Sequence, residues 1–169
     1  MPLYTYNPTA NETPDATLGG VAVTSPTNTG HASTSASASG AGAAQTKSCR
    51  WFTFPAFTGQ VKTMTLKITH SSDGSVIGPT AGNLLFIDYS LNNGSSWVNA
   101  VSRSGFTGAQ GPTTFSVALS ATQNTTQVQV RDDLFAESDD VGDSAEATAT
   151  VSDIKLEIET VDGGLLVMM

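Results

Sequence analysis

The chain has 169 residues and carries 15 acidic against 7 basic side chains, giving a formal net charge of -8. No run approaches the roughly 18 apolar residues of a membrane-spanning helix, and an acidic chain without a basic stripe lacks the cations that hold nucleic-acid phosphates. Serine and threonine contribute 43 residues and good helix formers are few. Composition therefore favours an all-β protein with neither membrane nor nucleic acid as its partner.

The first part of the chain, residues 1–47, is dominated by Ser, Thr, Ala, Gly, Asn and Pro. We expect an extended arm over 1–20 and a short strand over 21–24. Residues 31–39 alternate small side chains with hydroxyls, which suits either a flat edge strand or disorder, and 40–47 has the composition of a linker. The N-terminus lacks the basic and apolar regions of a secretory signal.

Strand signals become clear from residue 48 onward. Over residues 61–70, Met64, Leu66 and Ile68 face one way while Thr and Lys side chains face the other. Similar short runs occur at 49–54, 84–90, 97–101, 113–119 and 126–131. Residues 71–74 have the composition of a turn, and 102–112 that of a glycine-rich loop.

The longest run, residues 147–160, changes phase along its length. Ala147, Ala149 and Val151 share one parity, whereas Ile154, Leu156 and Ile158 share the other. A strand with a period of two cannot bury both sets unless an extra residue intervenes. The sequence therefore predicts a bulge or bend near Ser152 and Asp153.

Residues 90–97 (SLNNGSSW) resemble the Asp-box hairpin, with Asn92 in place of its Asp and Ser96 in place of its Thr. One copy excludes a propeller, and the motif is structural. The order of strands over about 48–160 is similar to jelly-roll domains of the galactose-binding or carbohydrate-binding-module type, which occur in glycan-degrading enzymes and on phage particles. The resemblance implies a ligand site on end loops or on an exposed aromatic platform.

Pattern and resemblance together predict an all-β fold, an antiparallel two-sheet jelly-roll-like β-sandwich with an extended N-terminal arm. We expect the arm at 1–47, with one or two weak strands, the sandwich at 48–160, and an apolar C-terminal tail at 161–169.

Aromatic rings are the first candidates for a binding site, because ring faces stack on sugars. Trp51 and Trp97 are candidates, with core packing as the alternative for both. Phe106 lies in the glycine-rich loop, where it either touches a partner or plugs the end of the sandwich.

An acidic cluster is the second candidate, with seven carboxylates between residues 132 and 146. Ca²⁺ binds six to eight oxygen ligands, so we expect Asp139, Asp140 and Asp143 to be its ligands if the loop holds a metal. The alternative is a solvated acidic loop.

The two ends of the chain are the third candidate, because a terminal apolar run is an aggregation risk unless it docks. We expect either assembly contacts near both ends or a tail folded onto its own core. The candidate assembly contacts are Leu3, Tyr4, Tyr6, Leu165, Leu166, Val167 and Met168.

Catalysis lacks a motif in this sequence, and the single cysteine, Cys49, is expected to be a small core residue. The leading hypothesis is a non-enzymatic phage virion structural protein, such as a capsid decoration, head-fibre or tail-associated protein. It would assemble in the host cytoplasm, dock on other virion proteins through its termini, and form a homo-oligomer. The alternative is a carbohydrate-binding module or extracellular adhesive domain that binds glycan.

Overall fold

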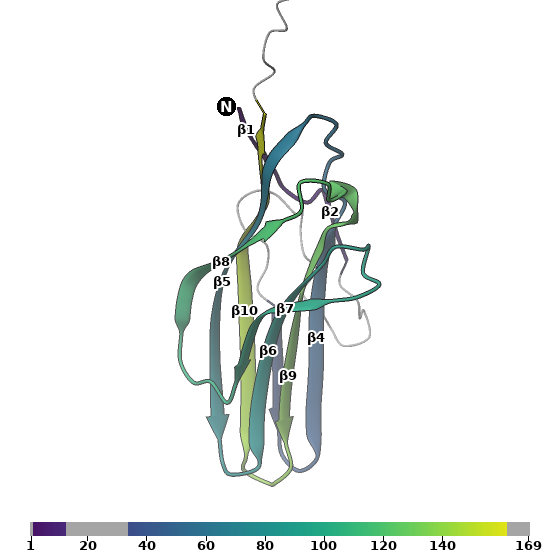
Figure 1. Ribbon diagram of the computed structural model, residues 1–169. Helices are drawn as coiled ribbons and strands as arrows, with labels where there is room; N and C mark the ends of the chain where they lie inside the picture. Colours follow the sequence, from purple (N-terminus) through teal and green to yellow (C-terminus); the bar gives the residue numbers. More distant parts are fainter. Residues whose placement is uncertain (1, 13–33, 162–169) are drawn as a thin grey trace, which may run out of the picture.

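The computed structural model describes residues 2–12 and 34–161 (Figure 1). These residues form strands and one short 3-10 helix. The elements are β1 (Leu3–Tyr6), β2 (Ala10–Glu12), β3 (Thr34–Ser39), β4 (Ala43–Phe52), β5 (Val61–Ile77), β6 (Ala81–Ser90), β7 (Val98–Ser104), β8 (Gln110–Leu119), η2 (Thr125–Gln127), β9 (Gln129–Ser138) and β10 (Ser144–Thr160).

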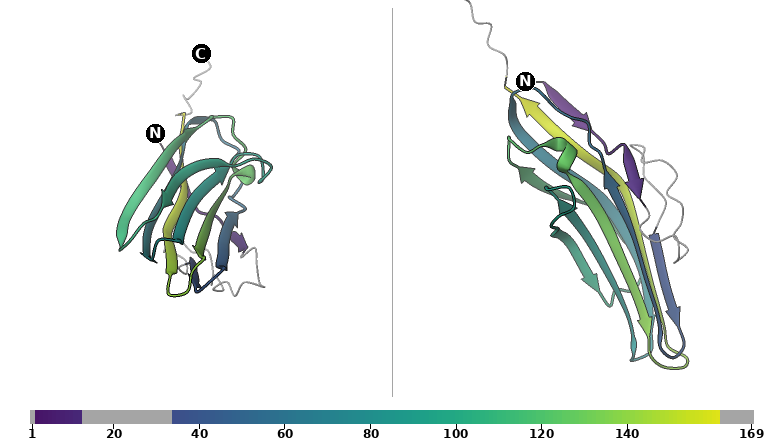
Figure 2. Two further views of the ribbon diagram at one scale, coloured as in Figure 1. Left: turned by 90° about the horizontal axis from the view of Figure 1, so that it is seen from below. Right: turned by 90° about the vertical axis from the view of Figure 1, so that its right-hand side faces the viewer.

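Two antiparallel sheets pack face to face into an elongated sandwich (Figure 2). Sheet A has the order β3-β10-β5-β8, and β1 pairs with β10 along the same edge as β3. Sheet B has the order β2-β4-β9-β6-β7. Strands β3 to β10 alternate between the sheets, except that β6 and β7 form a hairpin in sheet B; this is the order of a jelly roll and confirms the predicted antiparallel two-sheet sandwich.

The N-terminal segment belongs to the sandwich to a greater extent than its composition suggests. The boundary expected between residues 47 and 48 falls inside β4, so the expected linker over 40–47 is a tight turn followed by a strand. Ala36 and Ala38 of β3 are buried, and β1 and β2 extend one sheet each. The short strand expected over 21–24 lies outside the described residues.

Small residues on β3, on the first half of β10 and at Gly74 of β5 allow the two sheets to pack closely. The buried residues of β3 are Ala36 and Ala38, and those at the start of β10 are Ala145, Ala147 and Ala149, so the two sheets can approach closely there. A Cβ on Gly74 would lie 2.7 Å from the Phe106 ring and 2.8 Å from the Glu146 carbonyl oxygen. The turn expected over 71–74 is therefore wrong. Strand β5 continues through it, paired with β10, and Gly74 permits the close approach of the sheets.

The side chain of Asn83, on β6, connects three segments across this thin part of the core. Its Nδ2 donates to the carbonyl oxygens of Glu146 (2.7 Å) and Phe106 (2.9 Å), and its Oδ1 accepts from the Phe106 amide (2.9 Å). Asn83 is 1% exposed. One buried amide thus fixes the β7–β8 loop against β6 and β10.

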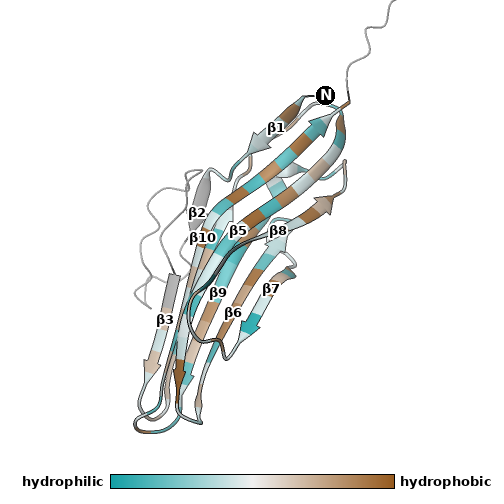
Figure 3. Cartoon of the chain, turned by 90° about the vertical axis from the view of Figure 1, so that its left-hand side faces the viewer, coloured by the Kyte–Doolittle hydropathy of each residue, from teal (hydrophilic) through white to brown (hydrophobic). Residues whose placement is uncertain are grey.

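The phase change in the last strand occurs where the sequence predicts it. Val151 pairs with His70 and Asp153 pairs with Thr69, so Ser152 is the extra residue of a bulge. The bulge keeps Val151 and Ile154 both in the core, and Figure 3 shows the alternation of apolar and polar residues along β5 and β10.

Candidate functional sites

Two of the three expected binding aromatics do not lie on the surface. Trp51 is 2% exposed and Phe106 is 6% exposed, so neither offers a ring face to a ligand. Alternation along β4 places Trp51 in the core, and Asn83 holds the β7–β8 loop so that Phe106 fills the space between the sheets. For Trp51 the alternative interpretation, core packing, is correct. For Phe106 the alternative, a residue that plugs the sandwich, is correct.

The third ring, Trp97, is half-buried beside the β6–β7 hairpin. The turn is closed by its own side chains: Ser90 Oγ accepts from the Gly94 amide at 2.9 Å, and Asn92 Oδ1 accepts from the Ser96 amide at 2.9 Å. Asn92 thus accepts a backbone hydrogen bond within the turn. The Arg131 guanidinium lies 4.4 Å from the centre of the Trp97 ring and covers one of its faces.

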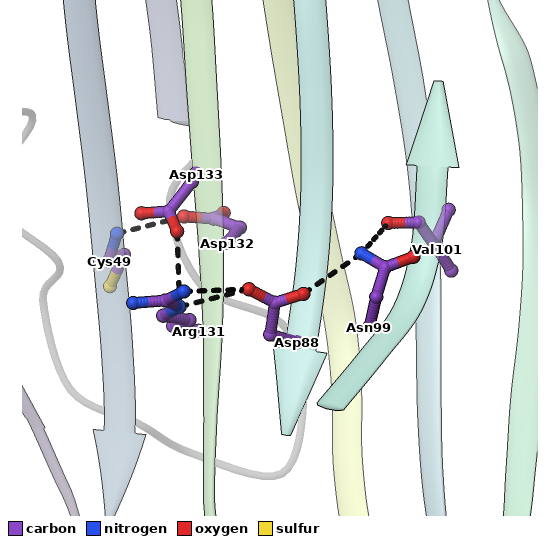
Figure 4. A network of polar contacts seen from close by, with 7 residues as sticks. All are labelled: Cys49, Asp88, Asn99, Val101, Arg131, Asp132 and Asp133. Carbon is purple, nitrogen blue, oxygen red and sulfur yellow. Dashed lines mark hydrogen bonds and ion pairs between the residues drawn. The ribbon is translucent and has the colours of Figure 1, made fainter. Parts of the chain in front are cut away.

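Arg131 is the centre of a polar network on the outer face of sheet B (Figure 4). Its Nε and Nη2 donate to Asp88 Oδ2 at 3.0 and 2.9 Å, and Nε lies 3.1 Å from Asp133 Oδ2. Asn99 Nδ2 donates to Asp88 Oδ1 at 2.9 Å. Burial raises the pKa of Asp133 and the nearby Asp88 adds to this, while Arg131 opposes the shift.

Partly exposed apolar residues lie beside this network and were missed by sequence reasoning. Leu84 pairs with Phe135, and Phe86 pairs with Asp133; all three apolar side chains are half-buried on the outer face of sheet B. The signal was available, because alternation that turns Leu85 inward turns Leu84 and Phe86 outward. Leu84, Phe86, Phe135 and Trp97 are called the outer-face patch below.

The acidic cluster does not form one loop. Asp132 and Asp133 lie on β9, and only residues 139–143 form the turn to β10. Among the described residues, no group of three or more His, Cys, Asp or Glu is placed to hold a metal ion. The structure therefore separates the carboxylates that the sequence grouped, because pairing of β9 with β6 continues as far as Ser138.

Asp143 has a structural role at the tip of the sandwich instead. Its Oδ2 accepts from the Thr80 amide and hydroxyl at 2.9 and 2.7 Å. Its carbonyl oxygen accepts from the Gly40 amide at 3.2 Å and the Ser138 hydroxyl at 2.9 Å. One residue thus joins the β3–β4, β5–β6 and β9–β10 turns, which lie together at the lower end of Figure 1. Asp139 and Asp140 are exposed.

His70 and Cys49 are both buried, at 2% and 1% exposure. Burial lowers the pKa of His70, and the charge of Arg103 lowers it further, so the ring is neutral at pH 7. Arg103 donates to Ser72 Oγ at 3.1 Å and also to Gln110. Cys49 lies in the core, as the sequence predicts.

The opposite end of the sandwich from the tip carries both the first and the last described strands. Strand β1 pairs with the end of β10, and the Thr160 amide donates to the Pro2 carbonyl at 3.2 Å. Tyr4 and Tyr6 pack on Phe57, with ring centres 5.5 and 6.2 Å apart. Leu3 is 63% exposed.

Further apolar surface lies at this end. Tyr4 is 43% exposed and Val161 is 49% exposed. Leu3, Tyr4 and Val161, with the half-buried Phe57, are called the terminal patch below. The expected contacts Leu165, Leu166, Val167 and Met168 lie outside the described residues.

Comparison with known proteins gives only distant structural likenesses. No protein-family model matches, and no curated protein matches by sequence. The chain is similar to the enzymatically active domain of bacteriophage CBA120 tailspike protein 4, with 11% identity, a TM-score of 0.33 and coverage of 94% of this chain and 19% of that chain.

Two further structures share this level of similarity. One is TmCBM61 in complex with β-1,4-galactotriose, with 11% identity, a TM-score of 0.26 and 70% of each chain covered. The other is from infectious bursal disease virus Gx strain, with 12% identity, a TM-score of 0.33 and coverage of 96% of this chain and 37% of that chain. Separately, no helix among the described residues has the length and apolar character needed to cross a membrane.

Proposed function

We propose that this chain is a non-enzymatic structural subunit of a virion, which docks on other virion proteins through its terminal patch and displays the rest of the jelly roll. One observation carries the proposal: apolar side chains are exposed where both ends of the described chain meet. Leu3 is 63% exposed and Tyr4 43% exposed. Isolated exposed apolar residues are ordinary, but several at one end, beside both termini, are typical of a contact surface.

The tip at the other end suits display. Its three turns are joined by Asp143, which accepts hydrogen bonds from the Thr80 and Gly40 amides. Asp139 and Asp140 place charge on the exposed turn, which favours a solvated end. The long axis of the sandwich thus separates the terminal patch from a tip that carries charged residues beside the exposed Ile77 and Val141 (Figure 2).

The test is incorporation into particles. In lysates of cells that produce the virion, the wild-type chain should co-purify with intact particles, and a Leu3→Asp, Tyr4→Asp variant should be incorporated at least about tenfold less, because buried carboxylates would face an apolar partner. Quantitative mass spectrometry of purified particles measures this. Val141→Asp is the matched control, since Val141 is 89% exposed but lies at the tip.

The control variant should be incorporated as wild type, and circular dichroism should show all three proteins folded. Equal incorporation of the terminal variant and the wild type would refute docking through this patch. Absence of the wild-type chain from particles would refute the virion function itself.

Glycan binding is the second candidate function, and the outer-face patch favours it. Phe86 and Phe135 present partly exposed rings beside Asp133 and Arg131, which are groups that can stack on and hydrogen-bond to a sugar. On a glycan array we expect Phe135→Ala to lose any binding that the wild type shows, and Phe115→Ala, on the other sheet, to retain it. No binding by the wild type would remove this function.

A further inference from the structure

Strand β8 forms an open edge of sheet A. It pairs with β5 on one side, and no strand among the described residues pairs with its other side. It is a ten-residue strand, at the outer edge of the sheet in Figure 1. Half of its backbone N–H and C=O groups therefore point away from the sheet and can accept another strand.

The part of β8 after Pro112 lacks the features that usually protect an edge, whereas the start of the strand carries Pro112 and a register shift in its pairing with β5. No charged residue occurs between Arg103 and Arg131, a stretch that includes the whole of β8. By contrast, the edge strand β7 of sheet B carries Arg103, and its pairing with β6 is interrupted by a bulge between Ile87 and Asp88. Edge strands of monomeric proteins are commonly blocked by such charges and bulges, so the regular, neutral part of β8 after Pro112 is the exception.

The side chains of β8 are also incompletely covered. Phe115, Val117 and Leu119 pack against the core but remain half-buried. The Phe115 ring has its centre 6.0 Å from that of Tyr89, so one side of the ring is packed. A strand added along β8 would cover the exposed sides of these residues and satisfy the free backbone groups in one step.

We propose that β8 pairs antiparallel with β8 of a second copy of this chain, which joins the two A sheets into one continuous sheet. Residues opposite each other in an antiparallel pair point to the same face. A two-fold axis at Val117 therefore sets Phe115 of one copy against Leu119 of the other and Val117 against itself. On the outward face Ser116 then lies opposite Ala118 as small, neutral side chains.

Charge favours a second copy at this edge. Two chains of net charge -8 repel each other over most of their surfaces, and the uncharged stretch allows them to approach with the least repulsion. A basic partner would gain most at the acidic surfaces and nothing from β8. This inference uses a different surface from the terminal patch and does not depend on the virion function.

The test is the self-association of the purified full chain, measured by sedimentation equilibrium. We expect the wild type to form a dimer, and Ser116→Lys and Ala118→Lys each to raise the dimer dissociation constant about tenfold or more, since the two-fold axis brings like charges together. Both positions are exposed, so a lysine there leaves the monomer folded. Thr46→Lys is the matched control, an exposed strand position on sheet B.

Each result decides the proposal. A dimer that is lost in both β8 variants and kept in Thr46→Lys supports it, as does slow amide exchange in β8 of the wild type alone. A monomeric wild type refutes it, and so does a dimer that persists in both β8 variants. Crosslinking gives a second measurement: Cys49 is buried, so Ser116→Cys adds an accessible thiol that a short bismaleimide should join across the axis, and Thr46→Cys should dimerise without being crosslinked.

Discussion

Replacement of Asn83 by alanine is expected to lower the free energy of unfolding by about 3 kcal/mol, the largest effect of any single polar truncation proposed for this chain. The Asn83 side chain is the hydrogen-bond partner of the Phe106 amide and of the Glu146 carbonyl oxygen, and it is 1% exposed. Alanine removes the acceptor of the buried Phe106 amide and the donor to the Phe106 and Glu146 carbonyl oxygens. Urea denaturation at pH 7 measures the change.

A second substitution tests the chemical reason. Asn83→Asp preserves shape and the acceptor for the Phe106 amide, but places a carboxylate against two carbonyl oxygens. It should destabilise at pH 7, and less in acid, where a protonated carboxyl can donate one hydrogen bond. Asn99→Ala, which removes an exposed amide that also makes two hydrogen bonds, should cost less than about 1 kcal/mol. Equal losses for Asn83→Ala and Asn99→Ala would contradict the explanation from burial.

The role of Asn83 shows which features of the fold can be predicted from sequence patterns and which cannot. Period-two alternation located the strands and even the bulge at Ser152, because burial on one face constrains every second residue. Nothing local distinguishes Asn83 from a turn residue. Its importance arises because Phe106, 23 positions later, needs a partner for its amide.

Local composition misled at two places for a related reason. Residues 71–74 have turn composition, and residues 132–138 have the charge of a loop, yet both continue as strands. In each case pairing with a long neighbouring strand outweighs the weak local preference, since tertiary context commonly overrides propensity. The candidate sites follow the same division: Leu3 and Tyr4 can be singled out from the sequence of the terminus, while the outer-face patch depends on which strands lie side by side.

Replacement of Arg131 by methionine is the second large effect, with an expected loss of about 2 kcal/mol at pH 7. Methionine retains much of the packing on Trp97 but removes the positive charge that Asp88 and Asp133 share. The Asp88 side chain is only 10% exposed, so its carboxylate would remain partly desolvated with Asn99 as its side-chain donor. Lys155→Met is the control, because Lys155 pairs with the more exposed Asp153 and Glu157, and should cost less than about 1 kcal/mol.

The dependence of this loss on pH distinguishes lost charge pairing from lost packing. Burial already raises the folded-state pKa of Asp133 above its unfolded value, and Arg131 opposes the rise more than the hydrogen bond with Ser48 does. Without Arg131 that pKa rises further, so the folded variant binds a proton before the unfolded chain does, and acidification favours its folded state. The difference in unfolding free energy between wild type and Arg131→Met should therefore shrink as pH falls from 7 through the folded pKa of Asp133. A loss independent of pH would show that Arg131 stabilises the fold through packing on Trp97 and not through its ion pairs with Asp88 and Asp133.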